Sequence, residues 1–237
     1  MKRICRSTIA VALLCTASLS VVAAPVTPTY TAFANLPGAT YGGSGIPTDP
    51  SAITTVGSLT LALAATQRGS GPNLGNNGAG TFYAPVGSQP GVPPRATWNF
   101  DYYISDSAGF ANDGLTFKLL YDFNAGINTD QANLGVWNFS PTTGNTIQDS
   151  QNLAFAFLTT GVPGVITPPP GTFNPNANGQ YSFALIGYRG TTEVGRSAIN
   201  VDVGSVADGT VPEPASLALL GLGFAGLMMN RRRTRAK

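Results

Sequence analysis

Apolar and polar side chains alternate along several short stretches of this chain. In residues 97–104 (TWNFDYYI) every second position carries a large apolar side chain, and residues 116–123 (TFKLLYDF) repeat the pattern. Further along, Ile199, Val201 and Val203 alternate with polar neighbours. Because successive side chains of a strand point to opposite faces, this period of two predicts strands that are buried on one face.

Further apolar stretches bring the expected number of strands to about eight. They are residues 53–66, 134–139, 153–160, 180–188 and 193–203, with 81–86 as a weak edge strand. Glycine and proline cluster between them, and no stretch of residues 24–211 shows a sustained helical period. Short strands joined by such turns, without intervening helices, predict an all-β protein with an antiparallel β-sandwich.

The same pattern divides the chain into five regions. A charge-poor segment that glycine and proline interrupt precedes the strands, and we expect it to form an extended arm with at most one edge strand. The predicted regions are an N-terminal apolar segment at 1–23, the arm at 24–50, the β-sandwich domain at 51–204, a linker at 205–211 and a C-terminal apolar and basic segment at 212–237.

The first of these regions has the parts of a secretory signal peptide. Lys2, Arg3 and Arg6 precede an apolar stretch, expected to be a signal helix, and small residues follow it. We expect signal peptidase to cut after Ala23, because a cut after Ala24 would leave a proline next to the cleaved bond. The protein is therefore expected to be exported.

The residues that remain after this cut contain neither cysteine nor histidine. Cys5 and Cys15 both lie in the signal peptide, so the mature fold must be held by its core instead of disulfides. The chain also has no histidine, which removes Ser-His-Asp and Cys-His arrangements and the usual zinc ligands. We predict that the protein is not an enzyme, with the paired-carboxylate chemistry of a glycosidase as a weaker alternative.

Charge is distributed unevenly along the chain. The whole chain carries a net charge of +2, but residues 24–211 hold five basic and ten acidic residues, which leaves −5. Nucleic acid binding requires a clustered basic surface. No nucleic acid partner is therefore expected.

The C-terminal region combines an apolar stretch with a basic cluster. Residues 215–229 contain only Ala, Leu, Gly, Phe and Met besides one serine, and predict a transmembrane helix. At 1.5 Å per residue this helix is roughly 22 Å long, whereas a bilayer core is roughly 30 Å thick. Arg231, Arg232 and Arg233 follow, and the positive-inside rule keeps them cytoplasmic. An ordinary tail anchor is the alternative, but this span is short for a permanent one.

Pro212, Glu213 and Pro214 stand just before this helix. The order of Pro-Glu-Pro, apolar helix and basic cluster closely resembles the PEP-CTERM sorting signal of Gram-negative bacteria. The resemblance implies that exosortase, a membrane-embedded cysteine protease or transpeptidase, removes the tail and releases or re-attaches the protein. It implies transient anchoring in the inner membrane, and then a location at the cell surface or in the extracellular matrix.

The resemblance also suggests partners and alternatives. Carriers of this signal tend to come from species that make exopolysaccharide, which is the expected partner if there is one. The same segment is sometimes named after ice-binding proteins, but regular Thr-x-Thr ladders are absent, so ice binding is a minor alternative. The region from about 97 to 204 is similar to exported domains that accompany the signal and have no assigned activity.

Residues 121–130 (YDFNAGINTD) carry oxygen ligands of the kind that calcium prefers. Asp122, Asn124, Asn128 and Asp130 could face one ion, although their spacing is not that of an EF-hand. Asp and Asn are also the ordinary residues of turns. We expect no cofactor, with calcium as the one candidate.

The aromatic residues offer a last possibility. Trp98, Trp137, Tyr103 and Phe139 could form a face on which sugar rings stack, but aromatic residues in strands more often belong to the core, and the alternation places Trp98 inside. The sequence thus predicts an exported, non-enzymatic β-sandwich protein with a structural or interaction role. A carbohydrate-binding module for exopolysaccharide is the alternative.

Overall fold

A computed structural model describes residues 24–40, 50–69 and 74–204 of this protein. Within these ranges it contains fourteen strands and only short helices, so the prediction of an all-β fold is confirmed. None of the helices in these ranges is long and apolar enough to cross a membrane. The predicted signal helix and the predicted transmembrane helix at 215–229 lie outside the described residues.

Five strands form the first sheet, in the order β1-β2-β3-β8-β11. All of its neighbouring strands are antiparallel. The strands are β1 (Ala32–Asn35), β2 (Pro50–Val56), β3 (Leu59–Gln67), β8 (Trp98–Asp106) and β11 (Thr146–Gln151).

Seven strands form the second sheet, in the order β12-β10-β9-β13-β14-β5-β4, and a small third sheet pairs β6 with β7. The pair β14 and β5 is parallel, which corrects the prediction of a wholly antiparallel fold. The strands are β4 (Gly75–Asn76), β5 (Thr81–Ala84), β6 (Ser88–Gln89), β7 (Arg95–Ala96), β9 (Leu115–Tyr121), β10 (Gly135–Phe139), β12 (Ile166–Thr167), β13 (Gly179–Arg189) and β14 (Thr192–Val203).

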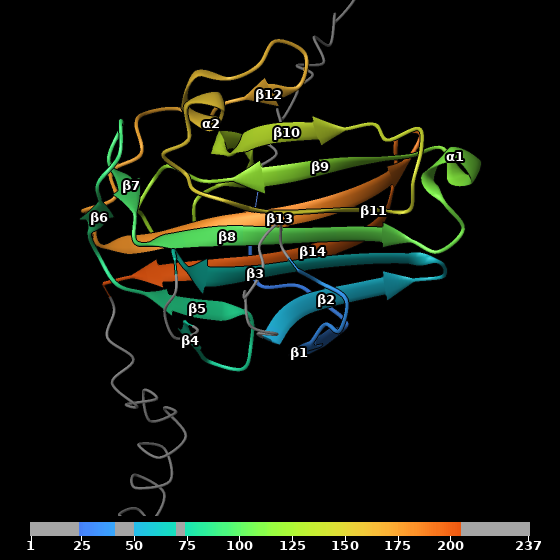
Figure 1. Ribbon diagram of the computed structural model, residues 1–237, viewed down its shortest axis with the longest axis horizontal. Helices are drawn as coiled ribbons and strands as arrows, with labels where there is room; N and C mark the ends of the chain where they lie inside the picture. The colour runs from blue at the N-terminus through green and yellow to red at the C-terminus, as the bar shows by residue number, and fades with distance from the viewer. Residues whose placement is uncertain (1–23, 41–49, 70–73, 205–237) are drawn as a thin grey trace, which may run out of the picture.

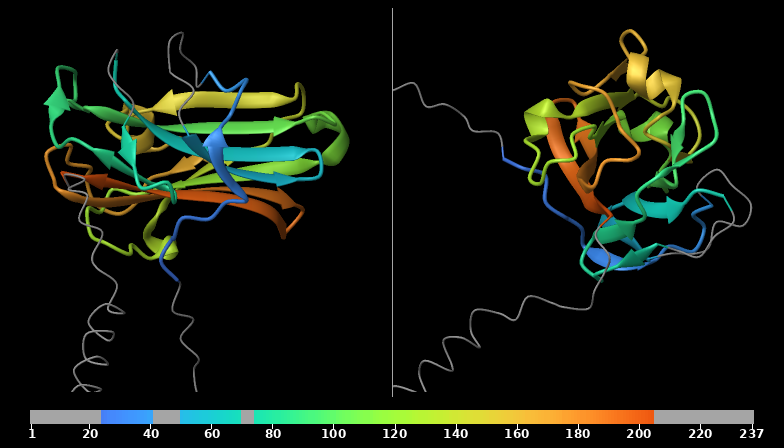
Figure 2. Two further views of the ribbon diagram at one scale, coloured as in Figure 1. Left: turned by 90° about the horizontal axis from the view of Figure 1, so that it is seen from below. Right: turned by 90° about the vertical axis from the view of Figure 1, so that its left-hand side faces the viewer.

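The two large sheets lie face to face as two layers (Figures 1 and 2). Aromatic rings fill the space between them: Phe100 of β8 stacks on Phe183 of β13 with ring centroids 4.8 Å apart. Trp98 lies beside the same core, 5.7 Å from the ring of Tyr181. Every second residue of β8 from Trp98 to Ile104 is buried against this core, as the alternation predicted.

Hydrogen bonds from side chains join the two sheets along one side of the sandwich. The hydroxyl of Ser197 in β14 donates to the carbonyl of Ala52 in β2 at 2.6 Å. The hydroxyl of Thr54 in β2 donates to the carbonyl of Arg196 in β14, also at 2.6 Å. This side is therefore closed by polar contacts between strands of different sheets.

The N-terminal arm adds to both sheets. Val26 is buried against the outer face of the second sheet, in a cluster with Leu120 and Ile186. Thr29 exchanges two backbone hydrogen bonds with Ala198 of β14, at 3.0 and 2.8 Å. After this crossing, β1 pairs with β2 at the edge of the first sheet. The arm thus covers apolar surface that the second sheet would otherwise expose.

Several strand predictions need correction. The stretch 153–160 is not a strand but leads into the short helix α2 (Ala156–Thr160), whose Leu158 is buried. The stretch 53–66 is a hairpin of two strands, turning at Gly57 with a φ of 59°. Strand β11 was not predicted, because its sequence TIQDSQ has almost no apolar residues and pairs only at a sheet edge.

A glycine at the start of β13 allows two segments to approach closely. A Cβ at Gly179 would overlap the carbonyl oxygen of Ala125, whereas a Cβ at Gly75 would make an ordinary contact, 3.7 Å from the ring of Tyr83. Gly179→Ala should lower the free energy of unfolding by about 1–3 kcal/mol, because the backbone must shift. Gly75→Ala is the control and should change it by less than about 0.5 kcal/mol. Urea unfolding measures both; equal effects would contradict the expectation.

Candidate functional site at an aromatic seam

A cluster of aromatic rings lies where β10 approaches the first sheet. Trp137 of β10 stacks on Phe139 with centroids 4.8 Å apart, and both rings contact Tyr102 of β8, at 5.6 and 5.4 Å. Phe157 of α2 packs edge-on against Trp137 at 5.5 Å, and Phe155 stacks on Phe157 at 5.8 Å. We call these five residues the seam cluster.

Most of the seam cluster reaches the surface. Tyr102 is buried, but Trp137, Phe139, Phe155 and Phe157 are half-buried, so part of each ring meets solvent. The four aromatic residues considered from the sequence do not share a face. Trp98 is only 2% exposed and belongs to the core. Tyr103 alternates with Tyr102 and points to the opposite face of the first sheet.

Polar groups accompany the rings on the neighbouring edge strand. Asp149 of β11 lies opposite Tyr102 in the strand register. Its carboxylate accepts hydrogen bonds from the Gln151 amide at 2.6 Å and from the backbone N–H of Ser150 at 2.8 Å. Burial, and then the charge of Asp149, raise the pKa of Tyr102, so its hydroxyl stays protonated. The seam thus places a half-buried carboxylate beside the partly exposed rings, while the Gln151 amide and the Tyr102 hydroxyl belong to buried side chains.

A buried asparagine holds the strand β7 to the start of the α2 region. The Asn152 side chain accepts the N–H of Ala96 at 3.1 Å, and its amide donates to the carbonyls of Ala96 and Trp98 at 3.0 and 2.8 Å. Neighbouring Arg95 places its guanidinium over the Phe155 ring, 4.6 Å from the centroid. Cation–π contact and the asparagine bonds therefore fix this end of the cluster.

The predicted calcium ligands use their oxygens locally. Asp122 is buried after β9 and accepts the N–H of Asn124 at 2.8 Å, and Asn124 in turn accepts the N–H of Gly126 at 2.9 Å. Asp130 accepts the N–H of Ala132, and Asn128 is exposed with a φ of 59°. Burial raises the pKa of Asp122, against hydrogen bonds that lower it. Calcium binding by these residues stays a prediction.

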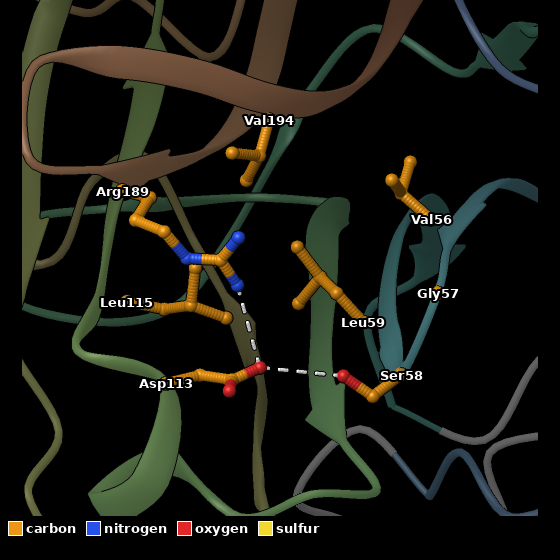
Figure 3. A pocket seen from close by; sticks show the side chains of 8 residues that line it. All are labelled: Val56, Gly57, Ser58, Leu59, Asp113, Leu115, Arg189 and Val194. Atoms are coloured by element: carbon orange, nitrogen blue, oxygen red, sulfur yellow. Dashed lines mark hydrogen bonds and ion pairs between the residues drawn. The ribbon is translucent and has the colours of Figure 1, made fainter.

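A cavity of about 340 Å³ lies at the end of the sandwich next to α1 (Phe110–Asp113), between the β2–β3 turn and the β13–β14 hairpin (Figures 1 and 3). Leu59 and Leu115 form apolar walls. Asp113 pairs with Arg189 at 3.5 Å and accepts a hydrogen bond from Ser58 at 3.4 Å. The polar groups are thus already engaged with one another, and they tie the β2–β3 turn to the β13–β14 hairpin.

Acidic clusters do not converge on a metal site within the described ranges. No group of three or more His, Cys, Asp and Glu side chains there could hold a metal ion.

Ala24, next to the predicted signal cleavage, is exposed, and its carbonyl accepts the N–H of Gln131 at 3.3 Å. Ala23 lies outside the described residues.

The sorting residues Pro212, Glu213, Pro214 and Arg231 to Arg233 also lie outside the described residues, and comparison with known families decides their identity. Residues 210–233 match the family model of the PEP-CTERM protein-sorting motif. The chain carries a PEP-CTERM sorting signal. This is the C-terminal signal of exosortase substrates, as the resemblance of the Pro-Glu-Pro segment predicted. Comparison with curated proteins and with solved structures gives no match.

Buried tyrosines should make the body of this PEP-CTERM protein sensitive to alkaline pH. Burial and the charge of Asp122 raise the pKa of Tyr181 to about 12, and burial also raises the pKa of Tyr121, whose hydroxyl donates to the carbonyl of Leu158. Unfolded tyrosine ionises near pH 10, so the unfolded state releases protons first. The stability is complete below about pH 10 and is lost as the pH rises through the folded-state values.

Phenolate absorbance and unfolding, followed together against pH, measure this effect. Tyr181→Phe should make the free energy of unfolding fall less steeply between about pH 10 and pH 12, because one proton release is removed. Ionisation of all eight tyrosines near pH 10 in a protein that stays folded would contradict the expectation.

Proposed function

We propose that this protein is exported, processed by exosortase and left at the cell surface or in the extracellular matrix, where it has a non-enzymatic structural or interaction role. The observation that carries this proposal is the sorting signal at residues 210–233. Exosortase and signal peptidase act on the chain as processing enzymes, and the inner membrane holds it transiently.

The composition of the body supports a role without catalysis. The region after the signal peptide has no cysteine, and the chain has no histidine, so the usual nucleophile and base pairs cannot be assembled. The ion pair between Asp113 and Arg189, together with the Ser58 hydroxyl, links three segments of the fold. These features suit a protein that is placed outside the cell and binds or supports other components there.

Mass spectrometry of the surface-associated protein tests the processing. The mature form should begin at Ala24 and lack Arg231, Arg232 and Arg233, because exosortase removes the tail. Pro212→Ala together with Glu213→Ala should leave the full-length tail in the membrane fraction, since the motif can no longer be read. A surface form that ends at Lys237 would overturn the proposal.

The seam cluster favours a second function, a carbohydrate-binding module for exopolysaccharide. Its half-buried rings bring apolar surface to the solvent, and the half-buried carboxylate of Asp149 lies on the adjoining strand. Sugars combine apolar C–H faces with hydroxyl groups, so they match a site that pairs aromatic rings with a carboxylate. The cluster lies at the surface, where a long polymer can pass without entering a closed cavity.

Binding to the producer's own polysaccharide, measured with the purified processed protein, tests this function. Trp137→Ala should weaken binding by about tenfold or more, because truncation of a central aromatic residue at an interface costs at least about 1–2 kcal/mol. Tyr103→Ala removes a half-buried ring from the opposite face of the first sheet and is the control. Equal binding by the two variants would argue against the seam as the site.

A further inference from the structure

Two arginines lie together at one end of the seam cluster. Arg68 follows β3. Its backbone N–H donates to the carbonyl of Thr97, and its backbone carbonyl accepts a hydrogen bond from the side-chain amide of Gln89 at 3.3 Å. Gln89 of β6 pairs directly with Arg95 of β7. Burial, and then the nearby charge of Arg95, lower the pKa of Arg68. We call Arg68 and Arg95 the arginine pair.

The arginine pair stands apart from the other cations of the body. Arg189 pairs with Asp113, Arg196 pairs with Glu193, and Lys118 lies over the Tyr188 ring. Within the part of the chain that the structure describes, the ion pairs include neither Arg68 nor Arg95. Two like charges held together without a carboxylate repel each other, and an anionic group between them would relieve this repulsion.

The local backbone holds Arg95 in place for such a contact. Gly91 lies so close that a Cβ there would come within 3.2 Å of the Arg95 Cγ and 3.3 Å of its Nε. The guanidinium also lies over the Phe155 ring. A planar guanidinium with a fixed orientation can bind a carboxylate through two parallel N–H groups, which a flexible ammonium cannot do.

We propose that the seam cluster and the arginine pair form one binding site for an acidic glycan, a chain of sugar units that bear carboxylates. The proposal rests on the carbohydrate-binding function above and names its ligand class. The contacts from Trp137 through Phe157 to Phe155 lead to Arg95, so a sugar chain that lies along the exposed parts of these rings brings one unit to its guanidinium. A carboxylate on that unit accepts their N–H groups, and Asp149 accepts from sugar hydroxyls.

The net charge of the body limits which anionic ligands can bind at this site. Because residues 24–211 carry −5 overall, a polyanion is not attracted by the whole surface and depends on the local pair. Two arginines are too few for nucleic acid, whose affinity rises from many phosphate contacts. An acidic peptide could reach the same arginines, and the experiment below includes it as an outcome.

Calorimetric titration of the processed protein with oligogalacturonate tests the proposal, with the fully methyl-esterified oligomer as the matched neutral ligand. The acid form should bind at least about tenfold more tightly than the ester, and added salt should reduce this difference. Arg95→Gln and Arg68→Gln should each shrink the difference, and the double variant should abolish it. Arg95→Lys keeps the charge without the planar fork and should give an intermediate value.

Two control variants separate the parts of the site. Arg189→Gln changes an arginine at the opposite end of the sandwich and should leave both affinities unchanged. Trp137→Ala should weaken acid and ester alike, because ring stacking does not depend on the carboxylate. Thermal unfolding of each variant confirms that it is folded; these substitutions replace half-buried or exposed side chains.

The remaining outcomes of the titration each contradict a different part of the proposal. Equal affinity for acid and ester would overturn the role of the arginine pair and leave the carbohydrate function standing. No binding of either oligomer by a protein that binds the producer's own polysaccharide would overturn the acidic ligand alone, and no binding of any of the three would overturn both proposals. The processing result from mass spectrometry would be unaffected. Binding of polyglutamate as tightly as oligogalacturonate would overturn the glycan in favour of an acidic peptide.

Discussion

The pairing of β14 constrains the rest of the molecule. This strand is hydrogen-bonded to β13 along nearly its whole length, runs parallel to β5 near its end and exchanges backbone hydrogen bonds with the N-terminal arm at Thr29. Its Ser197 also reaches the carbonyl of Ala52 in the other sheet. One strand therefore sets the spacing between the two sheets, and the aromatic core fills the distance that results.

This constraint makes the two long sides of the sandwich chemically different. Where β14 approaches β2, the sheets are joined by hydrogen bonds between a hydroxyl and a carbonyl. Where β10 approaches β8, no such pairing is needed, because the rings of Trp137, Phe139 and Tyr102 fill the gap. Side chains that fill an edge remain partly exposed, as Trp137 and Phe139 are at the seam.

The body and the sorting signal have separate roles. The signal at residues 210–233 is a substrate for another protein's chemistry and decides where the body is delivered. The body has no disulfide and relies on a closely packed core, in which Trp98 and Phe183 are almost completely buried. Binding at a surface is the role proposed for this body, and the half-buried rings and the arginine pair are the surface groups on which the proposal rests.

The sequence by itself determined the all-β class, the inward faces of β8 and β9 and the sorting signal, because each depends on residues that are close in the chain. A period of two is a local property, and so is the order of Pro-Glu-Pro, apolar stretch and arginines. The sequence pattern did not predict β11, because the polar residues of this strand give no period of two. It wrongly predicted a strand at 153–160, because apolar residues alone do not distinguish a strand from a short buried helix.

Only the tertiary structure decided which of these residues meet. Arg68 and Arg95 are far apart in the chain and come together because β6 pairs with β7 beside the end of β3. Trp98 and Trp137 both lie in predicted strands, yet Trp98 is in the core and Trp137 reaches the surface. The register between distant strands produces these differences, and register depends on long-range pairing that no local pattern records.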